Sequence, residues 1–190
     1  MTIVASKWSQ SLKDLVIDAI RSGTAHRYYT IPKCLTLLTD FHEMQKFSLF
    51  GWKMENMDDD VRRLVMSWPK LRILALPLDQ TFISLSTLRI IAEKCPKLRH
   101  LSITLDASTI PPFDISSESF GHKLESLTVG RAHSSNTQAS MEHRIEMARH
   151  LDLIFPHLKS INVSRNDVTW SGIRDLVKLC QDVRRGQTGQ

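Results

Sequence analysis

Three side chains in the C-terminal half of the chain have the spacing of a metal site. His143, Glu146 and His150 lie three and four residues apart, which places them on one face of a helix predicted for residues 141–155. Imidazole nitrogens and carboxylate oxygens together can bind zinc. The more common arrangement is a solvated helix face on which Glu146 and His150 interact, and no second ligand cluster supports a metal. The sequence therefore predicts no metal site.

Serine, histidine and acidic residues are present, but no motif arranges them for catalysis. The chain has no G-x-S-x-G nucleophile motif, no zinc signature and no glycine-rich phosphate loop, and it contains 7 glycines in all. We therefore expect no catalytic residue, no cofactor and no enzymatic activity. The remaining candidates are side chains that could bind a protein partner.

These candidates belong to a six-residue motif that occurs six times. Its plainest copy, Leu71-Arg72-Ile73-Leu74-Ala75-Leu76, has apolar residues at the first, fourth and sixth positions. A period in the twenties to thirties is typical of stacked repeats, each of them a short supersecondary unit. We therefore expect each copy to form the core of a strand, and the copies cover residues 12–17, 44–49, 71–76, 98–103, 124–129 and 158–163.

Helical patterns precede several copies and repeat with them. Within residues 57–68, four apolar residues have the i, i+3, i+4, i+7 spacing of one helix face, and the same face recurs 27 residues later at Leu88, Ile91, Ala92 and Cys95. Helices are also expected at 33–42, 141–155 and 169–183, followed by a frayed tail at 184–190. Because each connection between strands is a long crossover, the strands should be parallel.

The junctions between helix and strand carry a family resemblance. They read Trp68-Pro69-Lys70-Leu71-Arg72-Ile73-Leu74, Cys95-Pro96-Lys97-Leu98-Arg99-His100-Leu101 and Phe155-Pro156-His157-Leu158-Lys159-Ser160-Ile161. With the closing helical stretch Ile173–Cys180, they resemble leucine-rich-repeat proteins, and within them the irregular repeat regions of F-box proteins of the kind common in fungi. The resemblance implies an α/β leucine-rich-repeat solenoid of about six repeats that spans 1–190 as a single domain. Parallel strands would line its concave side and helices its convex side.

The resemblance also implies a function: a non-catalytic protein–protein interaction module, the substrate-recognition part of an F-box-type ubiquitin ligase subunit. The F-box is the N-terminal helical module that docks on the ligase adaptor, and residues 1–11 leave no room for one. The adaptor is therefore expected as a partner only if an N-terminal F-box is missing from this chain. The alternative is a stand-alone scaffold or regulatory binder unconnected with ubiquitin.

Side chains alternate along a strand, so the third and fifth motif positions should face the concave surface. Two interpretations are equally open: a shallow groove for a partner's protruding segment, or small residues that suit closely packed parallel strands. The second positions, with Lys70 and Lys97, form a mostly basic edge that could attract an acidic or phosphorylated partner, although a solvated rim is the more common outcome. The candidate partner-binding residues are Lys46, Ser48, Arg72, Ile73, Arg99, His100, Ser126, Thr128, Ser160 and Asn162.

Two loops and one strand edge are further candidates. Residues 106–122 and 130–140 interrupt the period, and insertions of this kind often carry binding sites, although loops also drift without function. The first copy, 12–17, has no capping unit before it. We therefore expect it to be an exposed edge strand unless Trp8 and its neighbours cover it.

Composition narrows the class of partner and the compartment. The net charge is +5, but no dense basic run and no interleaved aromatic residues occur, so we do not expect nucleic acid as a partner. The 3 cysteines are far apart and suggest neither a disulfide framework nor a zinc site. No signal-peptide pattern begins the chain, and no apolar run approaches the roughly 20 residues that span a bilayer. We expect an intracellular protein, cytoplasmic or nuclear, that does not contact membranes.

Overall fold

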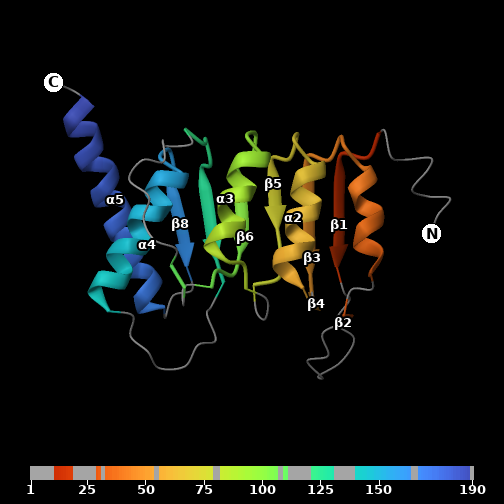
Figure 1. Cartoon of the computed structure of the whole chain (residues 1–190), viewed down its shortest axis with the longest axis horizontal. Coiled ribbons are helices and arrows are strands. Elements are labelled where there is room, and N and C mark those ends of the chain that lie inside the picture. Colours follow the sequence, from red (N-terminus) through yellow and green to blue (C-terminus); the bar gives the residue numbers. More distant parts are fainter. Residues whose placement is uncertain are drawn as a thin grey trace.

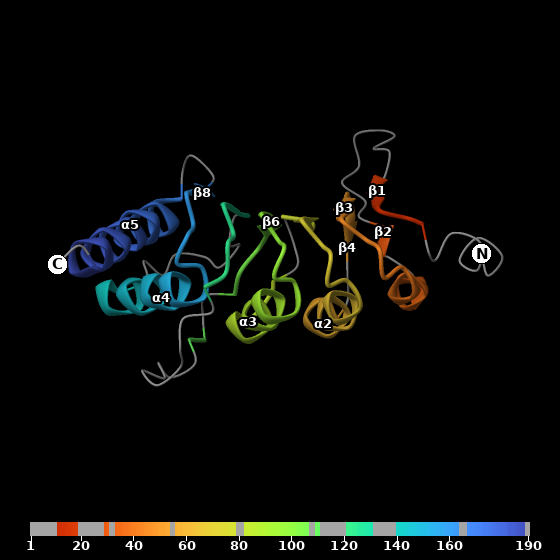
Figure 2. The same ribbon diagram turned by 90° about the horizontal axis from the view of Figure 1, so that it is seen from above.

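The structure, a computed structural model, has an α/β architecture with one six-stranded parallel sheet (Figure 1). Figure 2 shows the helices that precede the strands together on one side of that sheet. The structure describes residues 11–18, 29–30, 33–53, 56–78, 82–106, 109–110, 121–130, 140–163 and 167–188.

The strands follow one another across the sheet in chain order, and every neighbouring pair is parallel. All six motif copies are strands, as predicted, and each strand begins at the third motif residue. A separate two-stranded parallel sheet pairs β2 (Tyr29–Thr30) with β4 (Trp52–Lys53). The strands of the main sheet are β1 (Asp14–Asp18), β3 (Lys46–Phe50), β5 (Ile73–Ala75), β6 (His100–Ile103), β7 (Ser126–Val129) and β8 (Ser160–Val163).

One backbone carbonyl per copy sets the register of the sheet. The carbonyl of Arg72, a second motif residue, accepts hydrogen bonds from the N–H groups of Arg99 at 2.8 Å and His100 at 3.1 Å. Because a slip of one residue would turn every side chain to the opposite face, this pair of bonds fixes which residues are buried. The same pair of bonds recurs at the second residues of four other copies, Lys13, Gln45, Arg99 and Glu125.

Three α-helices and a 3-10 helix connect described strands, and a fourth α-helix follows the last strand. The predicted helix at 33–42 is the 3-10 helix η1, and the helices predicted at 57–68 and 141–155 are confirmed. Ser84 and Ser140 begin α3 and α4 by accepting the N–H groups of Thr87 and His143. The bounds are η1 (Lys33–Asp40), α2 (Met57–Ser67), α3 (Leu85–Lys94), α4 (Met141–Ile154) and α5 (Val168–Thr188).

The last helix is longer than the pattern predicts. Residues 184–188 belong to α5, so the frayed tail predicted from residue 184 is wrong as far as Thr188. Arg184 anchors this end, because its Nη1 donates to Asp152 of α4 at 2.7 Å and its Nη2 to the carbonyl of Pro156 at 2.6 Å. Among the described helices, none combines the length and the apolar character that a bilayer crossing would need.

The core lies between the sheet and the helices and is built from the apolar motif positions. Trp68, at the end of α2, is fully buried; its ring centroid lies 5.1 Å from that of Phe47, and its Nε1–H donates to the Leu38 carbonyl at 3.1 Å. Strand and helix each contribute one apolar side, so the repeated pattern creates one continuous core. In the third copy, the first, fourth and sixth positions are almost fully buried: Leu71, Leu74 and Leu76.

Within the described residues, β1 is the terminal strand of the sheet, paired with β3 alone. Its burial alternates, with Leu15 and Ile17 partly buried against the core and Val16 53% exposed. The residues proposed to cover it, Trp8 among them, lie outside the described residues.

Gly130, directly after β7, occupies a position where a side chain does not fit. Its N–H donates to the Ile103 carbonyl at 2.9 Å, and an added Cβ would overlap the Leu78 carbonyl oxygen and the Thr104 hydroxyl. We predict that Gly130→Ala lowers the free energy of unfolding by about 1–3 kcal/mol, because backbone atoms of Leu78 would have to move. Urea denaturation measures this change.

Gly186 in α5 is the matched control, because a Cβ added there meets nothing within 4 Å. Gly186→Ala should leave the stability unchanged or raise it slightly, since alanine is the better helix former. Equal stability of Gly130→Ala and the wild type would show that the packing around Gly130 is looser than described.

Candidate functional site

One side of the sheet carries all the third and fifth motif positions. Third positions pair with third positions across the sheet, and fifth with fifth. The helices η1, α2, α3 and α4 lie on the opposite side, and α5 lies beyond β8 at the end of the sheet (Figure 2). None of the described helices therefore covers this surface, which we call the bare face: Asp14, Val16, Lys46, Ser48, Ile73, Ala75, His100, Ser102, Ser126, Thr128, Ser160 and Asn162.

Eight of the ten predicted partner-binding residues lie on the bare face, and seven of these eight are accessible. The other two, Arg72 and Arg99, are second motif residues that precede the bare face. Ser48 is only 4% exposed, so its prediction as a contact residue is wrong. Its short side chain lies on β3 between its register partners Val16 and Ala75. His100, in contrast, is exposed on β6.

The end of the bare face near β8 is polar and internally hydrogen-bonded. The exposed Asn162 side chain donates from Nδ2 to the Ser126 hydroxyl at 3.1 Å and to the Thr128 hydroxyl at 3.5 Å. These bonds hold the three side chains in one arrangement across β7 and β8. Their remaining donors and acceptors form a short polar ladder that an extended segment could hydrogen-bond.

The predicted basic edge exists, but an acidic residue divides it. Glu125 accepts hydrogen bonds from Arg99 at 3.2 Å and from Lys159 at 3.1 Å. The hydrogen bond from Lys159 is the main cause that lowers the pKa of Glu125, and the charges of Lys159 and Arg99 add to it. Lys70, the flanking lysine of an earlier copy, pairs with Glu43. The cationic character is therefore concentrated around Arg72, where no such pairing occurs among the described residues.

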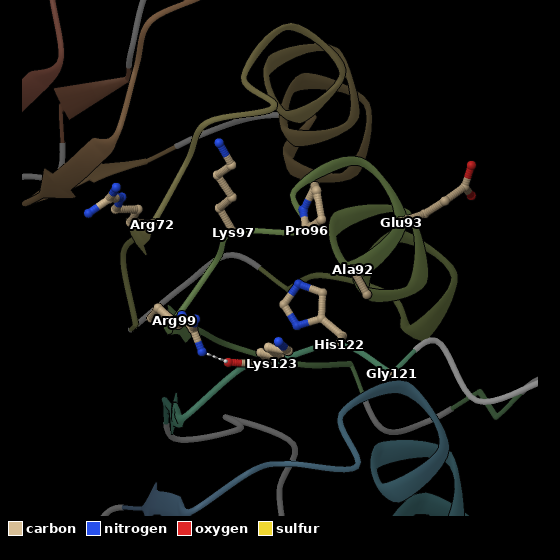
Figure 3. Close-up of a pocket in the computed structure, with 9 residues that line it drawn as sticks. All are labelled: Arg72, Ala92, Glu93, Pro96, Lys97, Arg99, Gly121, His122 and Lys123. Carbon is tan, nitrogen blue, oxygen red and sulfur yellow. Dashed lines mark hydrogen bonds between the residues drawn. The ribbon is translucent and has the colours of Figure 1, made fainter.

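A cavity of about 680 Å³ opens at this concentration of charge (Figure 3). It lies where β5, β6 and β7 begin, next to the C-terminal end of α3. Four cationic side chains and one carboxylate line it, together with small and apolar groups. We call this site the cationic hollow: Arg72, Ala92, Glu93, Pro96, Lys97, Arg99, Gly121, His122 and Lys123.

His122 holds the wall of the hollow together. It stands where other copies have the proline of the junction, two residues before the motif. In those copies the first motif residue donates its N–H to a carbonyl three residues earlier, as Leu98 does to Cys95 at 3.0 Å. Here Leu124 donates instead to His122 Nδ1 at 3.0 Å, and the imidazole replaces that carbonyl.

These contacts define the protonation state of His122. Because Nδ1 accepts the Leu124 N–H, the proton of the neutral ring is on Nε2, which donates to the Cys95 carbonyl at 2.9 Å. His122 is 4% exposed, and its ring makes a T-shaped contact with the Phe155 ring at a centroid distance of 5.2 Å. Burial lowers the pKa of His122, and the nearby charge of Arg99 lowers it further, against the opposing effect of the Cys95 hydrogen bond.

Sequence reasoning missed His122 and Lys123. The signal was present in the alignment of the copies, since Lys123 occupies the position of Lys70 and Lys97, one residue before the motif. The basic edge predicted from the sequence included Lys70 and Lys97 at this position but omitted Lys123, the fourth cation of the hollow. From the sequence alone, a histidine at the position of the junction proline did not indicate these hydrogen bonds.

The structure does not assemble the metal site considered for α4. His150 is 7% exposed, so the expected solvated face is wrong for this residue, whereas Glu146 is exposed. Among the described residues, no group of three histidine, cysteine or acidic side chains is placed to hold a metal ion. Cys95 is buried, and burial raises its pKa to about 12, so it is a thiol at neutral pH.

The loop candidates lie largely outside the described residues, which omit 111–120 and 131–139. Comparison with known proteins adds no relative: no protein-family model matches the chain, and no curated protein matches it.

The buried imidazole predicts a pH dependence of stability. The ordinary pKa of histidine is 6.5, and that of folded His122 is lower. The unfolded chain therefore binds a proton at a pH where the folded chain does not, so stability falls as the pH drops through 6.5 towards the folded pKa. We expect unfolding free energy to decline less steeply from pH 7 to pH 5 in His122→Gln than in the wild type.

His157→Gln is the control, because His157 is exposed in the equivalent junction before β8. It should keep the pH slope of the wild type. Chemical denaturation at several pH values gives all three slopes, and an unchanged slope in His122→Gln would contradict the assigned protonation state.

Proposed function

We propose that the chain is a leucine-rich-repeat solenoid of about six repeats and that it serves as a non-catalytic protein-interaction module. The observation that carries the proposal is the bare face itself, on which two motif positions from every copy align in register and no described helix covers them. A surface maintained across six strands in this way is available to a partner without any rearrangement.

The repeat assignment is supported by features that recur from copy to copy. The second-position carbonyl accepts the same two bonds in five copies, and large side chains are buried three residues before the motif, as at Trp68 and Phe155. The gentle curvature of the strand row in Figure 2, with the helices on its outer side, also favours a solenoid.

The dimensions and chemistry of the bare face favour an extended protein segment as the ligand. Neighbouring strands lie about 4.8 Å apart, so six strands span roughly 24 Å. The side chains are short over most of this width, and they change from Val16 and Ile73 at one end to the hydroxyl and amide groups around Asn162 at the other. Such a surface can take both apolar and polar side chains of a partner.

The resemblance to F-box proteins extends the proposal to the substrate-recognition part of a ubiquitin ligase subunit. The bare face would then bind the protein that is to be modified. A stand-alone scaffold or regulatory binder is the alternative, and it would use the same surface.

Two substitutions test the bare face. Ile73→Arg and Ser160→Arg place a long charged side chain at different points of the surface, on β5 and β8, and should each weaken partner capture by about tenfold or more. Met66→Arg is the control, because Met66 is 65% exposed on α2, on the helix side. Quantitative affinity purification measures the loss, and circular dichroism checks the fold. Retention of every partner by both face variants would exclude the bare face.

The ligase extension has a separate test. Affinity purification of the full gene product should enrich the adaptor of a cullin-type ligase. If partners depend on the bare face but no adaptor is enriched, the scaffold alternative replaces the ligase interpretation.

A further inference from the structure

The helix α5 has apolar side chains on two sides. Its inner side belongs to the core, with Trp170, Ile173 and Val177 almost fully buried. Gln181 continues this side, because its Nε2 donates to the Leu158 carbonyl at 3.0 Å. These contacts hold the helix on the protein, so its outer side is not required for that packing.

The outer side carries a second apolar row, formed by Leu176, Leu179 and Val183. Their spacing of three and four residues places them together along the helix. Leu179 is 59% exposed and Val183 is 53% exposed, whereas Leu176 is partly buried against the core. Figures 1 and 2 show α5 as the last element in the row of described elements, beyond β8. Within the described residues, no helix or strand covers Leu179 and Val183.

A row of charged residues runs beside the apolar row, one residue earlier at each step. It consists of Asp175, Lys178, Asp182 and Arg185, so the sign of the charge alternates along the helix. All four side chains are exposed. Within α5, Arg185 pairs with Asp182 at 3.4 Å, and Asp175 pairs with Arg174 at 3.1 Å. Exposed pairs of this kind are weak enough to be exchanged for others.

The charged row is complementary to a second copy of itself. Its steps of three, four and three residues read the same in both directions, so an antiparallel copy of α5 matches it position by position. Asp175 then lies opposite Arg185 of the other copy, and Lys178 lies opposite Asp182. Each of these pairs occurs twice, because the arrangement has twofold symmetry.

The apolar row matches in the same arrangement. Leu179 lies opposite Val183 of the other copy, and Leu176 lies opposite Gly186, whose missing side chain leaves room for the leucine. A parallel pair of helices does not give this match. It would place each charged row beside the other flank of the apolar row, where the half-buried Cys180 lies.

We propose that α5 is a homodimerisation surface, on which two copies of the chain associate through the outer sides of antiparallel helices. The matched segment, residues 175–186, covers about three turns of helix and roughly 17 Å. So small a surface supports a weak, reversible dimer, in which the paired charges determine the antiparallel orientation more than the affinity. The proposal is independent of the proposed function, since none of these residues belongs to the bare face.

Analytical ultracentrifugation of the purified chain tests the dimer. We expect a reversible monomer–dimer equilibrium with a dissociation constant on the order of 100 µM. Val183→Arg should weaken dimerisation by about tenfold or more, because it places two guanidinium groups in the apolar row. Val168→Arg is the matched control, since Val168 is an exposed valine of the same helix that lies outside the matched segment. Circular dichroism checks the fold of each variant.

Charge reversal tests the antiparallel pairing separately. Lys178→Asp or Asp182→Lys alone puts like charges opposite each other at two places, so each variant should dimerise about fivefold or more weakly than the wild type. An equimolar mixture of the two variants should form a heterodimer as tightly as the wild type dimerises. In that heterodimer every reversed charge meets an opposite charge.

A wild-type chain that stays monomeric at every concentration would overturn the proposal, as would a Val183→Arg variant that dimerises like the wild type. Equal association of the charge variants alone and in mixture would exclude the antiparallel pairing of α5. The outcome is separable from that for the bare face. If the wild type is monomeric while Ile73→Arg and Ser160→Arg lose captured partners, the dimer fails and the interaction module stands.

Discussion

The arrangement of the chain depends on one backbone carbonyl in each motif copy. The second motif residue, such as Arg72, accepts two consecutive N–H groups from the next strand, and this happens between every neighbouring pair of the main sheet. The bonds are parallel-sheet bonds whose partners come from copies some thirty residues apart, so they form only when each crossover connection brings the chain back to the same end of the sheet. Once formed, they dictate which three motif positions are buried and which remain outside.

That division determines where function can reside. The first, fourth and sixth positions are buried in the core, as Leu98, Leu101 and Ile103 illustrate. A smaller side chain at any of them would leave a cavity. Apart from the buried Ser48, the third and fifth positions lie outside the core, and they range from Asp14 to Asn162 along the sheet. A partner bound as we propose would contact the residues that the fold leaves outside the core, and the repeated leucines hold those residues in place.

The periodic part of this architecture was predictable from sequence, because one local pattern recurs and each copy reinforces the others. The strands, their order and the faces of α2 and α3 follow from it. The features that were not predicted depend on contacts between distant residues: the extension of α5 through Arg184, the burial of Ser48 and His150, and the role of His122. The sequence repeat predicts toward which face of the sheet a side chain points, but not how large the neighbouring side chains are. Ser48 was therefore wrongly predicted to be accessible.

The cationic hollow shows how an irregular copy can gain a site. Three residues before the motif, other copies bury a large side chain or a cysteine, as at Trp68, Cys95 and Phe155, but this copy has the exposed Gly121 with a φ of 57°. In that left-handed conformation glycine is the residue of least strain, so the position could not easily carry a core side chain. His122 then supplies the missing acceptor for Leu124, which keeps the strand in register without that side chain. The cavity therefore lies where this copy has Gly121 instead of a buried side chain, a difference that leaves the strand register intact. The arginine and lysine residues of the neighbouring copies make the cavity cationic.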